Sequence, residues 1–382
     1  MRSLTITNYE GDPLEMTLEY PNSVAFMYSR QPAAVTITEG ADKVTAVQLT
    51  VTLLAANPRS HTETRAFYGG RVEFDISRTM QLLATDLDEV LRRIDGRQGA
   101  SLANSFRLSV AVVLNNGTVL PMYGQPADIV GMYGALDQGE TYGEATQRRL
   151  WVNLPQTFNL WPDSEGDVAF VIGQTTVQPT AATGQPCNEC SLVDALKRAG
   201  REDLLAALSS SARSDVKLTW RSHISGGTET AQGFRTVTLV PDTRKAEDGT
   251  YLRWINRRGE LSYFLFTNST LKVTTTLSET FSRHYDGDPS VPVRKGYVNP
   301  QKASYREARE MELGASGLTL DEFEDLLDLA TSPVVERLVE TDMWQRVTLA
   351  NGSFKRRIRR NTPTLQDMEI VIELPERNTV TL

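Results

Sequence analysis

The sequence predicts a mainly β protein with two β-rich domains, each sandwich- or barrel-like, and a few amphipathic helices. Three observations lead to this prediction. Many segments alternate apolar and polar residues, Asn-Gly pairs separate such segments, and few stretches have helical periodicity. The chain has 382 residues, of which 40% are hydrophobic and 23% charged, which is an ordinary balance for a globular protein. That length allows two domains.

The clearest strands are expected at residues 14–20 and 47–53, where every second residue is apolar. Phe106 to Leu114 is denser in apolar residues, which predicts a strand buried on both faces. Further strands are expected at residues 1–7, 168–172, 216–221, 234–240, 261–266, 271–277 and 368–374.

Turn residues support the same fold class. Asn116-Gly117 and Asn351-Gly352 each stand between two strand-like segments, and Asn-Gly tolerates the positive φ angles of a type I′ hairpin turn. Arg258-Gly259 is a third hairpin turn of the same kind.

Three helices are expected between the strands. The first begins with Ser77 as its cap and continues to Ile94. The second covers residues 191–208, with a kink or a break at Gly200. The third begins at Thr319, which can form a capping box with the residue three positions later.

The domain boundary is expected at residues 174–190, a linker rich in Thr, Ala, Gln and Pro without periodicity. An N-terminal β-rich domain of residues 1–173 would precede it. A C-terminal β-rich domain with helices, residues 191–382, would follow. No signal peptide and no apolar run long enough for a membrane helix is apparent, so we expect a soluble chain that does not bind membranes.

Composition argues against most catalytic chemistries. With 2 cysteines, 3 histidines and a net charge of −8, the chain does not suggest a disulfide framework, a metal centre or a nucleic-acid-binding surface. Cys187 and Cys190 form a single C-x-x-C pair, which leaves a redox role or a metal shared between subunits open beside two ordinary loop cysteines. No nucleotide-binding or nucleophile motif occurs. We expect no enzyme activity, no cofactor, no metal and no direct nucleic-acid binding.

Charge is segregated near the C-terminus, which predicts a contact between subunits. Opposite charges on two surfaces set the register and orientation of a complex. The basic residues share one face of a strand and the acidic ones lie on the third helix. The residues of this predicted interface are Lys355, Arg357 and Arg359 against Asp321, Glu324, Asp325 and Asp328.

Tyr251 to Phe266 is an aromatic hairpin and the most distinctive segment of the chain. Its aromatic side chains, Trp254 among them, are expected in a sheet core. The alternative is a carbohydrate-binding or adhesive module, in which Trp151, Trp161 and Trp254 would stack on sugars.

This hairpin resembles a pattern of poorly characterised tail-region proteins from phages and prophages of Bacteroidota. Three other segments resemble the same proteins: Val24–Tyr28 leading into Pro32, Tyr68–Ser77, and Thr331–Val335 before Trp344. The resemblance implies a β-rich, ring-forming component similar to distal tail or baseplate hub proteins. It provides no motif for functional residues.

From this resemblance we expect a structural subunit of a phage-type tail or baseplate that acts by oligomerisation and docking of neighbours. Its partners would be further copies of itself, in a ring-like homo-oligomer, and other tail or baseplate proteins. It would be made in the host bacterial cytoplasm and become part of the virion tail.

Overall fold

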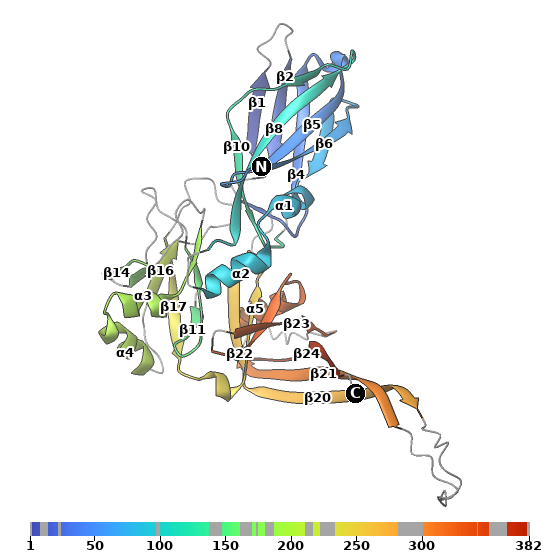
Figure 1. Ribbon diagram of the computed structural model, residues 1–382. Coiled ribbons are helices and arrows are strands. Elements are labelled where there is room, and N and C mark those ends of the chain that lie inside the picture. Colours follow the sequence, from blue (N-terminus) through green and yellow to red (C-terminus); the bar gives the residue numbers. More distant parts are fainter. Residues whose placement is uncertain are drawn as a thin grey trace, which may run out of the picture. The chain divides into compact units, whose positions relative to one another are not determined.

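The computed structural model describes residues 2–7, 14–21, 24–96, 100–136, 147–160, 170–172, 175–179, 187–210, 217–221, 234–281, 301–341, 343–350 and 365–379. Within them the protein is mainly β, with short helices between the strands (Figure 1). The expected fold class is therefore confirmed. No helix in these ranges is both long and apolar enough to cross a membrane.

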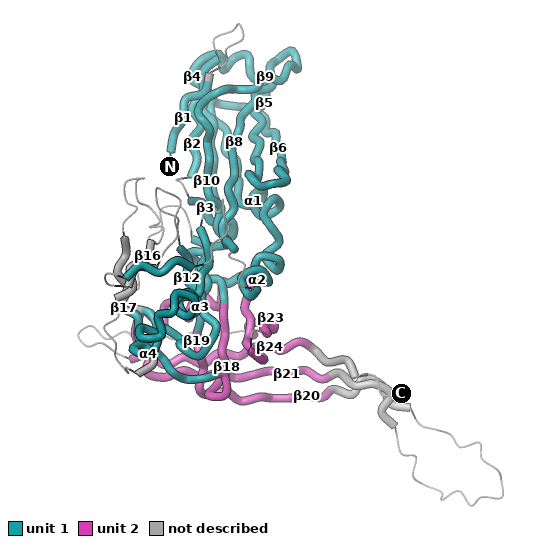
Figure 2. The backbone as a smooth tube through the Cα atoms, turned by 60° about the vertical axis from the view of Figure 1, so that its left-hand side comes forward, with its two compact units in different colours: residues 1–245, 254–263, 331–333 teal, residues 246–253, 264–330, 334–382 magenta. Residues whose placement is uncertain are grey.

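The chain divides into two compact units, neither of which is one continuous stretch (Figure 2). Unit 1 holds residues Met1–Lys245, Trp254–Tyr263 and Thr331–Pro333. Unit 2 holds residues Ala246–Arg253, Phe264–Ala330 and Val334–Leu382.

The division between the units does not follow the segment 174–190, where the linker was expected. The described parts of that segment include strands β14 (Thr175–Val177) and β15 (Asn188–Cys190), both in unit 1. Val177 and Cys190 belong to one of its buried cores. The described parts of the segment are therefore held in unit 1 by apolar packing that its composition does not indicate.

Unit 1 begins with a β-sandwich. One sheet has the order β1-β2-β4-β7, and the other has the order β3-β10-β8-β5-β6, with β9 paired to β8. Both views show these sheets side by side (Figures 1 and 2). Their strands are β1 (Arg2–Thr7), β2 (Glu15–Tyr20), β3 (Val24–Phe26), β4 (Pro32–Glu39), β5 (Val44–Leu53), β6 (Arg59–Ala66), β7 (Arg71–Asp75), β8 (Ala103–Leu114), β9 (Val119–Pro121) and β10 (Ala127–Met132). A short 3-10 helix, Ala41–Lys43, precedes β5.

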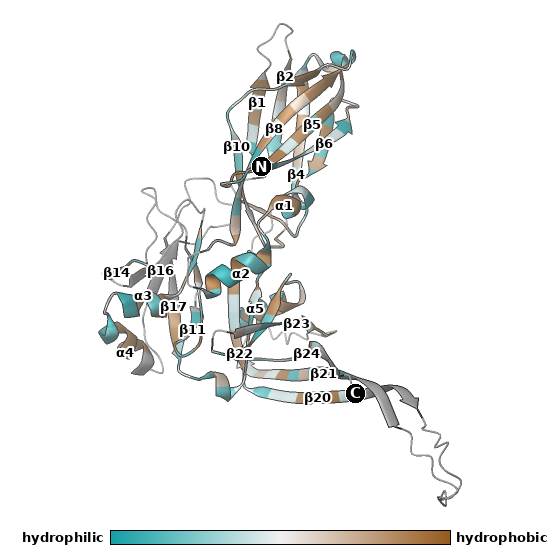
Figure 3. Ribbon diagram, viewed as in Figure 1, coloured by the Kyte–Doolittle hydropathy of each residue, from teal (hydrophilic) through white to brown (hydrophobic). Residues whose placement is uncertain are grey.

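Each sheet of the sandwich buries one face, as the sequence periodicity predicts. Alternate residues of β2 and β5 are buried. The expectation that β8 is buried on both faces is wrong, because Arg107 points to solvent and donates hydrogen bonds to Asp128 at 2.7 and 2.8 Å. Figure 3 shows hydrophobic and hydrophilic residues alternating along β8. Its outer face is thus the solvent face of the sandwich.

The first expected helix is two helices, α1 (Ser77–Leu83) and α2 (Leu87–Asp95). The N–H and the hydroxyl of Thr85 both donate to Asn104 Oδ1, at 3.3 and 3.1 Å, so a tertiary contact occupies the interruption. Asp86 caps α2 by accepting from the backbone N–H of Asp88. Ser77 is not the cap of α1 but its first residue.

The rest of unit 1 is a second β-rich part with two helices. A five-stranded sheet has the order β11-β17-β16-β13-β14, and a separate pair joins β12 to β15. The further strands are β11 (Gln147–Trp151), β12 (Phe158–Leu160), β13 (Phe170–Ile172), β16 (Lys217–Arg221) and β17 (Phe234–Asp242). Helices α3 (Leu192–Arg198) and α4 (Glu202–Ser210) are separated at Gly200, whose φ of 64° confirms the expected break.

Unit 2 is built on a seven-stranded sheet with the order β19-β18-β22-β23-β24-β21-β20. Strands β18 (Thr250–Ile255) and β19 (Leu261–Phe266) divide between the units after Arg253 and after Tyr263. The other strands are β20 (Asn268–Phe281), β21 (Gln301–Leu318), β22 (Val335–Glu340), β23 (Met343–Leu349) and β24 (Gln366–Thr379). A 3-10 helix, Ala246–Asp248, precedes β18.

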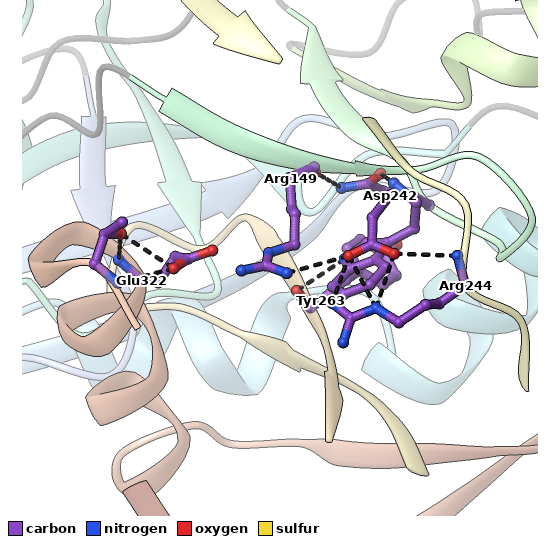
Figure 4. A network of polar contacts seen from close by, with 8 residues as sticks. Arg149, Asp242, Arg244, Tyr263 and Glu322 are labelled. Carbon is purple, nitrogen blue, oxygen red and sulfur yellow. Dashed lines mark hydrogen bonds and ion pairs between the residues drawn. The ribbon is translucent and has the colours of Figure 1, made fainter. Parts of the chain in front are cut away.

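Helix α5 (Leu320–Leu327) of unit 2 begins as predicted. Thr319 and Glu322 form the expected capping box, because each side chain accepts from the other residue's backbone N–H (Figure 4). A 3-10 turn, Asp328–Ala330, follows the helix.

Two of the three expected hairpin turns are confirmed. Gly117 joins β8 to β9 with a φ of 82°, and Gly259 joins β18 to β19 with a φ of 78°. Both angles lie in the left-handed region that favours glycine. The Asn351-Gly352 turn lies outside the described residues.

Candidate functional site

The acidic half of the predicted charged interface lies on α5 and the turn after it, in unit 2. Asp321 is exposed, Glu324 and Asp325 are half-buried, and Asp328 is buried. Asp328 therefore cannot face a neighbouring subunit, which corrects that part of the prediction. The basic half, Lys355, Arg357 and Arg359, lies outside the described residues.

Two of the three tryptophans proposed for sugar stacking, Trp151 and Trp254, do not offer a surface for it. Trp151 and Trp254 have exposed fractions of 0% and 1%. A ring that stacks on a sugar must expose one face to solvent. Trp151 and Trp254 do not, so both are core residues. Trp161 lies outside the described ranges.

The surroundings of Trp151, all in unit 1, explain its burial. The guanidinium carbons of Arg149 and Arg244 lie 5.6 and 5.5 Å from the centre of its ring. Asp242 holds both arginines, accepting from Arg149 at 3.1 Å and from Arg244 at 2.9 Å (Figure 4). The indole N–H donates to the backbone oxygen of Tyr263 at 3.3 Å. The tryptophan is thus a fixed centre of packing.

The two cysteines do not have the properties of a reactive C-x-x-C pair. Cys187 and Cys190 are free thiols and both are buried. Burial raises the pKa of each thiol to about 12, so both are protonated at neutral pH. Among the described residues, no group of three or more His, Cys, Asp and Glu side chains is arranged to hold a metal ion.

Strand β20 of unit 2 lies at one end of the seven-stranded sheet. Along one side β20 pairs with β21, from Asn268 opposite Gly314 to Phe281 opposite Gln301. The sheet order ends at β20, so no described strand pairs with its other side. All residues from 268 to 275 are exposed. We call this segment, Asn268–Thr275, the open edge.

The apolar face of the sheet continues onto the open edge. Ile372 on β24 lies opposite Met311 on β21, which in turn lies opposite Leu271 on β20. Along this row the side chains pass from buried, through half-buried, to an exposed fraction of 45% at Leu271. Val273, two residues further on the same face, is 49% exposed. Two apolar side chains are therefore exposed beside a strand edge with which no described strand pairs.

Few charges protect the open edge. Its one charged residue is Lys272, and the Lys272 ammonium is bound to Glu310 of β21 at 3.1 Å. Natural sheets usually guard an exposed edge with charged side chains. The edge strand β6 of unit 1 follows that rule, with Arg59, His61, Glu63 and Arg65 at alternate positions. The open edge, with Lys272 as its one charged residue, has less of this protection.

Sequence reasoning predicted a strand at residues 271–277 but not its place at the end of a sheet. Strand order depends on pairing between distant segments, which local periodicity does not encode. The available signal was composition, since one charged residue in ten Thr-rich positions from 268 to 277 is unusual for an exposed strand. No protein-family model and no curated protein matches the chain.

Proposed function

We propose that this protein is a structural subunit of a phage-type tail or baseplate, and that it assembles by adding a strand of a neighbouring copy to the open edge. The open edge carries the proposal. An exposed strand offers unpaired N–H and C=O groups to a partner strand, and its alternate side chains provide specificity. The resemblance of four sequence segments to phage tail proteins agrees with an assembly role.

A second copy of the chain fits the chemistry of the open edge. The Lys272–Glu310 pair leaves the edge without net charge, so two copies can approach without electrostatic repulsion. Leu271 and Val273 would lose their contact with water in the pairing. Because the contact is apolar and hydrogen-bonded, it should persist at high salt.

The test is the molar mass of the purified chain by light scattering, for the wild type and two double variants. Leu271→Lys with Val273→Lys adds charge to the open edge. Thr64→Lys with Ala66→Lys adds the same charge to exposed positions of β6, an edge strand that already carries charge. We expect an oligomer for the wild type and the β6 variant, and a monomer for the open-edge variant.

Three results would contradict the proposal. A wild type that stays monomeric at all concentrations would show that the chain does not self-assemble. An open-edge variant with the wild-type molar mass would show that β20 is not part of the interface. An oligomer that dissociates in high salt would instead favour the charged contact of Asp321 and Glu324 with the basic segment near residue 357.

A further inference from the structure

The carboxyl group of Glu189 lies buried in the middle of β15, in unit 1. The residue is 4% exposed, and its strand pairs with β12. Its Oε2 accepts a hydrogen bond from the Thr157 hydroxyl at 2.9 Å, and its Oε1 accepts one from Asn159 Nδ2 at 3.2 Å. Its backbone N–H donates to the oxygen of Ala100 at 2.8 Å. Distant parts of the chain therefore meet at this one residue.

No described side chain forms an ion pair with Glu189. Arg148, a cation that influences its pKa, is paired with Glu260 at 3.1 Å. Burial raises the pKa of Glu189 to about 7; the hydrogen bond from Thr157 opposes this shift, and the negative charge of Glu260 adds to it. An unpaired buried carboxylate is costly, so the neutral acid is favoured.

The other titratable groups around Glu189 do not compensate its charge. Cys190 follows it on β15 and Cys187 directly precedes that strand, and burial keeps both thiols protonated. The Tyr263 hydroxyl is connected to Glu189 through Thr157, because the hydroxyl oxygens of Tyr263 and Thr157 are hydrogen-bonded at 2.8 Å. Glu260 repels the carboxylate, while Arg148 attracts it only weakly.

Asn159 supplies a second, independent observation. Its Oδ1 is buried and accepts no hydrogen bond from the described residues, while its Nδ2 donates to Glu189 and also lies 3.4 Å from Cys187 Sγ. A carboxylate cannot donate to Oδ1, but a carboxylic acid can. An amide and a carboxylic acid form two hydrogen bonds to each other, whereas an amide and a carboxylate form one.

We propose that folded unit 1 holds Glu189 as a neutral carboxylic acid that donates its proton to Asn159 Oδ1, and that loss of this proton weakens the β12–β15 pair. The protonated carboxyl group then stabilises the contact between β12, β15 and the residues before β8. Helix α3 begins directly after this point. The Ser191 hydroxyl caps it by accepting a hydrogen bond from the backbone N–H of Asp194 at 3.2 Å. Loss of the Glu189 proton would therefore also affect the start of that helix.

The sign of the pH dependence follows from the direction of the shift. Between the ordinary pKa of 4.5 and the folded value of about 7, the folded state binds the proton more tightly than the unfolded state. The stability from this group is therefore full below pH 4.5, falls as the pH rises, and is lost above about pH 7.

The experiment compares thermal unfolding of the full chain and its Glu189→Gln variant between pH 5 and pH 8. Glutamine keeps the shape and the donor of the neutral acid but cannot lose a proton. Relative to this variant, we expect the folding equilibrium constant of the wild type to fall on the order of 10- to 100-fold from pH 5 to pH 8. Parallel curves for the two proteins would overturn the proposal.

A spectroscopic readout covers the case in which the variant is poorly stable. The infrared spectrum of the wild type at pH 6 should contain the C=O stretch of a protonated carboxyl group, and Glu189→Gln should lack it. The matched control is Glu39→Gln, at an exposed carboxyl group of β4, and it should retain this band. A wild type without the band at pH 6 would overturn the proposal.

Discussion

The guanidinium of Arg253 donates to Glu336 Oε2 at 2.7 Å while its carbon lies 4.1 Å from the centre of the Trp344 ring. All three residues belong to unit 2, and the arginine side chain is only 2% exposed. The charge is therefore neutralised by one neighbour and covered by an aromatic face of another. This arrangement joins β18, β22 and β23.

We expect Glu336→Gln to lower the free energy of unfolding by about 3 kcal/mol, because it removes the counter-charge of a buried guanidinium. The double variant Arg253→Met with Glu336→Leu should lose less, since no buried charge remains. Chemical denaturation of the variants measures both values. A single variant as stable as the wild type would show that the ion pair contributes nothing.

Two glycines in hairpin turns differ in the space around them. Gly117→Ala should cost about 1 kcal/mol, because alanine is strained at a φ of 82° but meets no atom within 4 Å. Gly259→Ala should cost about 3 kcal/mol, because its Cβ would also lie 3.0 Å from Met132 Cβ and 3.1 Å from the N of Gly134. Thermal unfolding compares the two, and equal losses would rule out the steric contribution.

The capping box of α5 predicts a smaller effect. Thr319→Ala should reduce stability by about 1 kcal/mol, since the backbone N–H of Glu322 loses the acceptor that it has at 3.3 Å. Thr319→Ser keeps a hydroxyl and serves as the control. If both substitutions were equally harmful, the threonine methyl group rather than the cap would be responsible.

Cys187 and Cys190 should resist alkylation by iodoacetamide in the folded protein at pH 8. Their pKa of about 12 leaves almost no thiolate, and burial excludes the reagent. In denaturant both should react completely, as intact-mass spectrometry would record. Rapid labelling of either thiol in the native protein would reopen a redox role.

Local signals were enough to predict many of the strands, the break at Gly200, the Thr319 capping box and two hairpin turns. These features depend on neighbouring residues, so periodicity and turn chemistry reveal them. The interruption between α1 and α2 was missed because it involves Asn104, about twenty residues away. The pocket around Glu189 joins Thr157, Asn159 and the residues near Ala100, a combination that no sequence spacing indicates.

The burial of single residues could not be predicted from the sequence either. The acidic residues at the third helix were all expected in one contact between subunits, yet Asp328 is buried. The tryptophans could be assigned to a core or to a surface from sequence, and the packing of two arginines on Trp151 decided for the core.

The division of the chain between the units has a consequence for the order of synthesis. Residues 331–333 complete unit 1 but leave the ribosome only after residues 264–330 of unit 2, a delay on the order of several seconds. Until then the backbone N–H of Ile255 lacks the Ser332 hydroxyl that accepts its hydrogen bond at 3.0 Å. A nascent chain that stalls before residue 331 would hold neither unit complete.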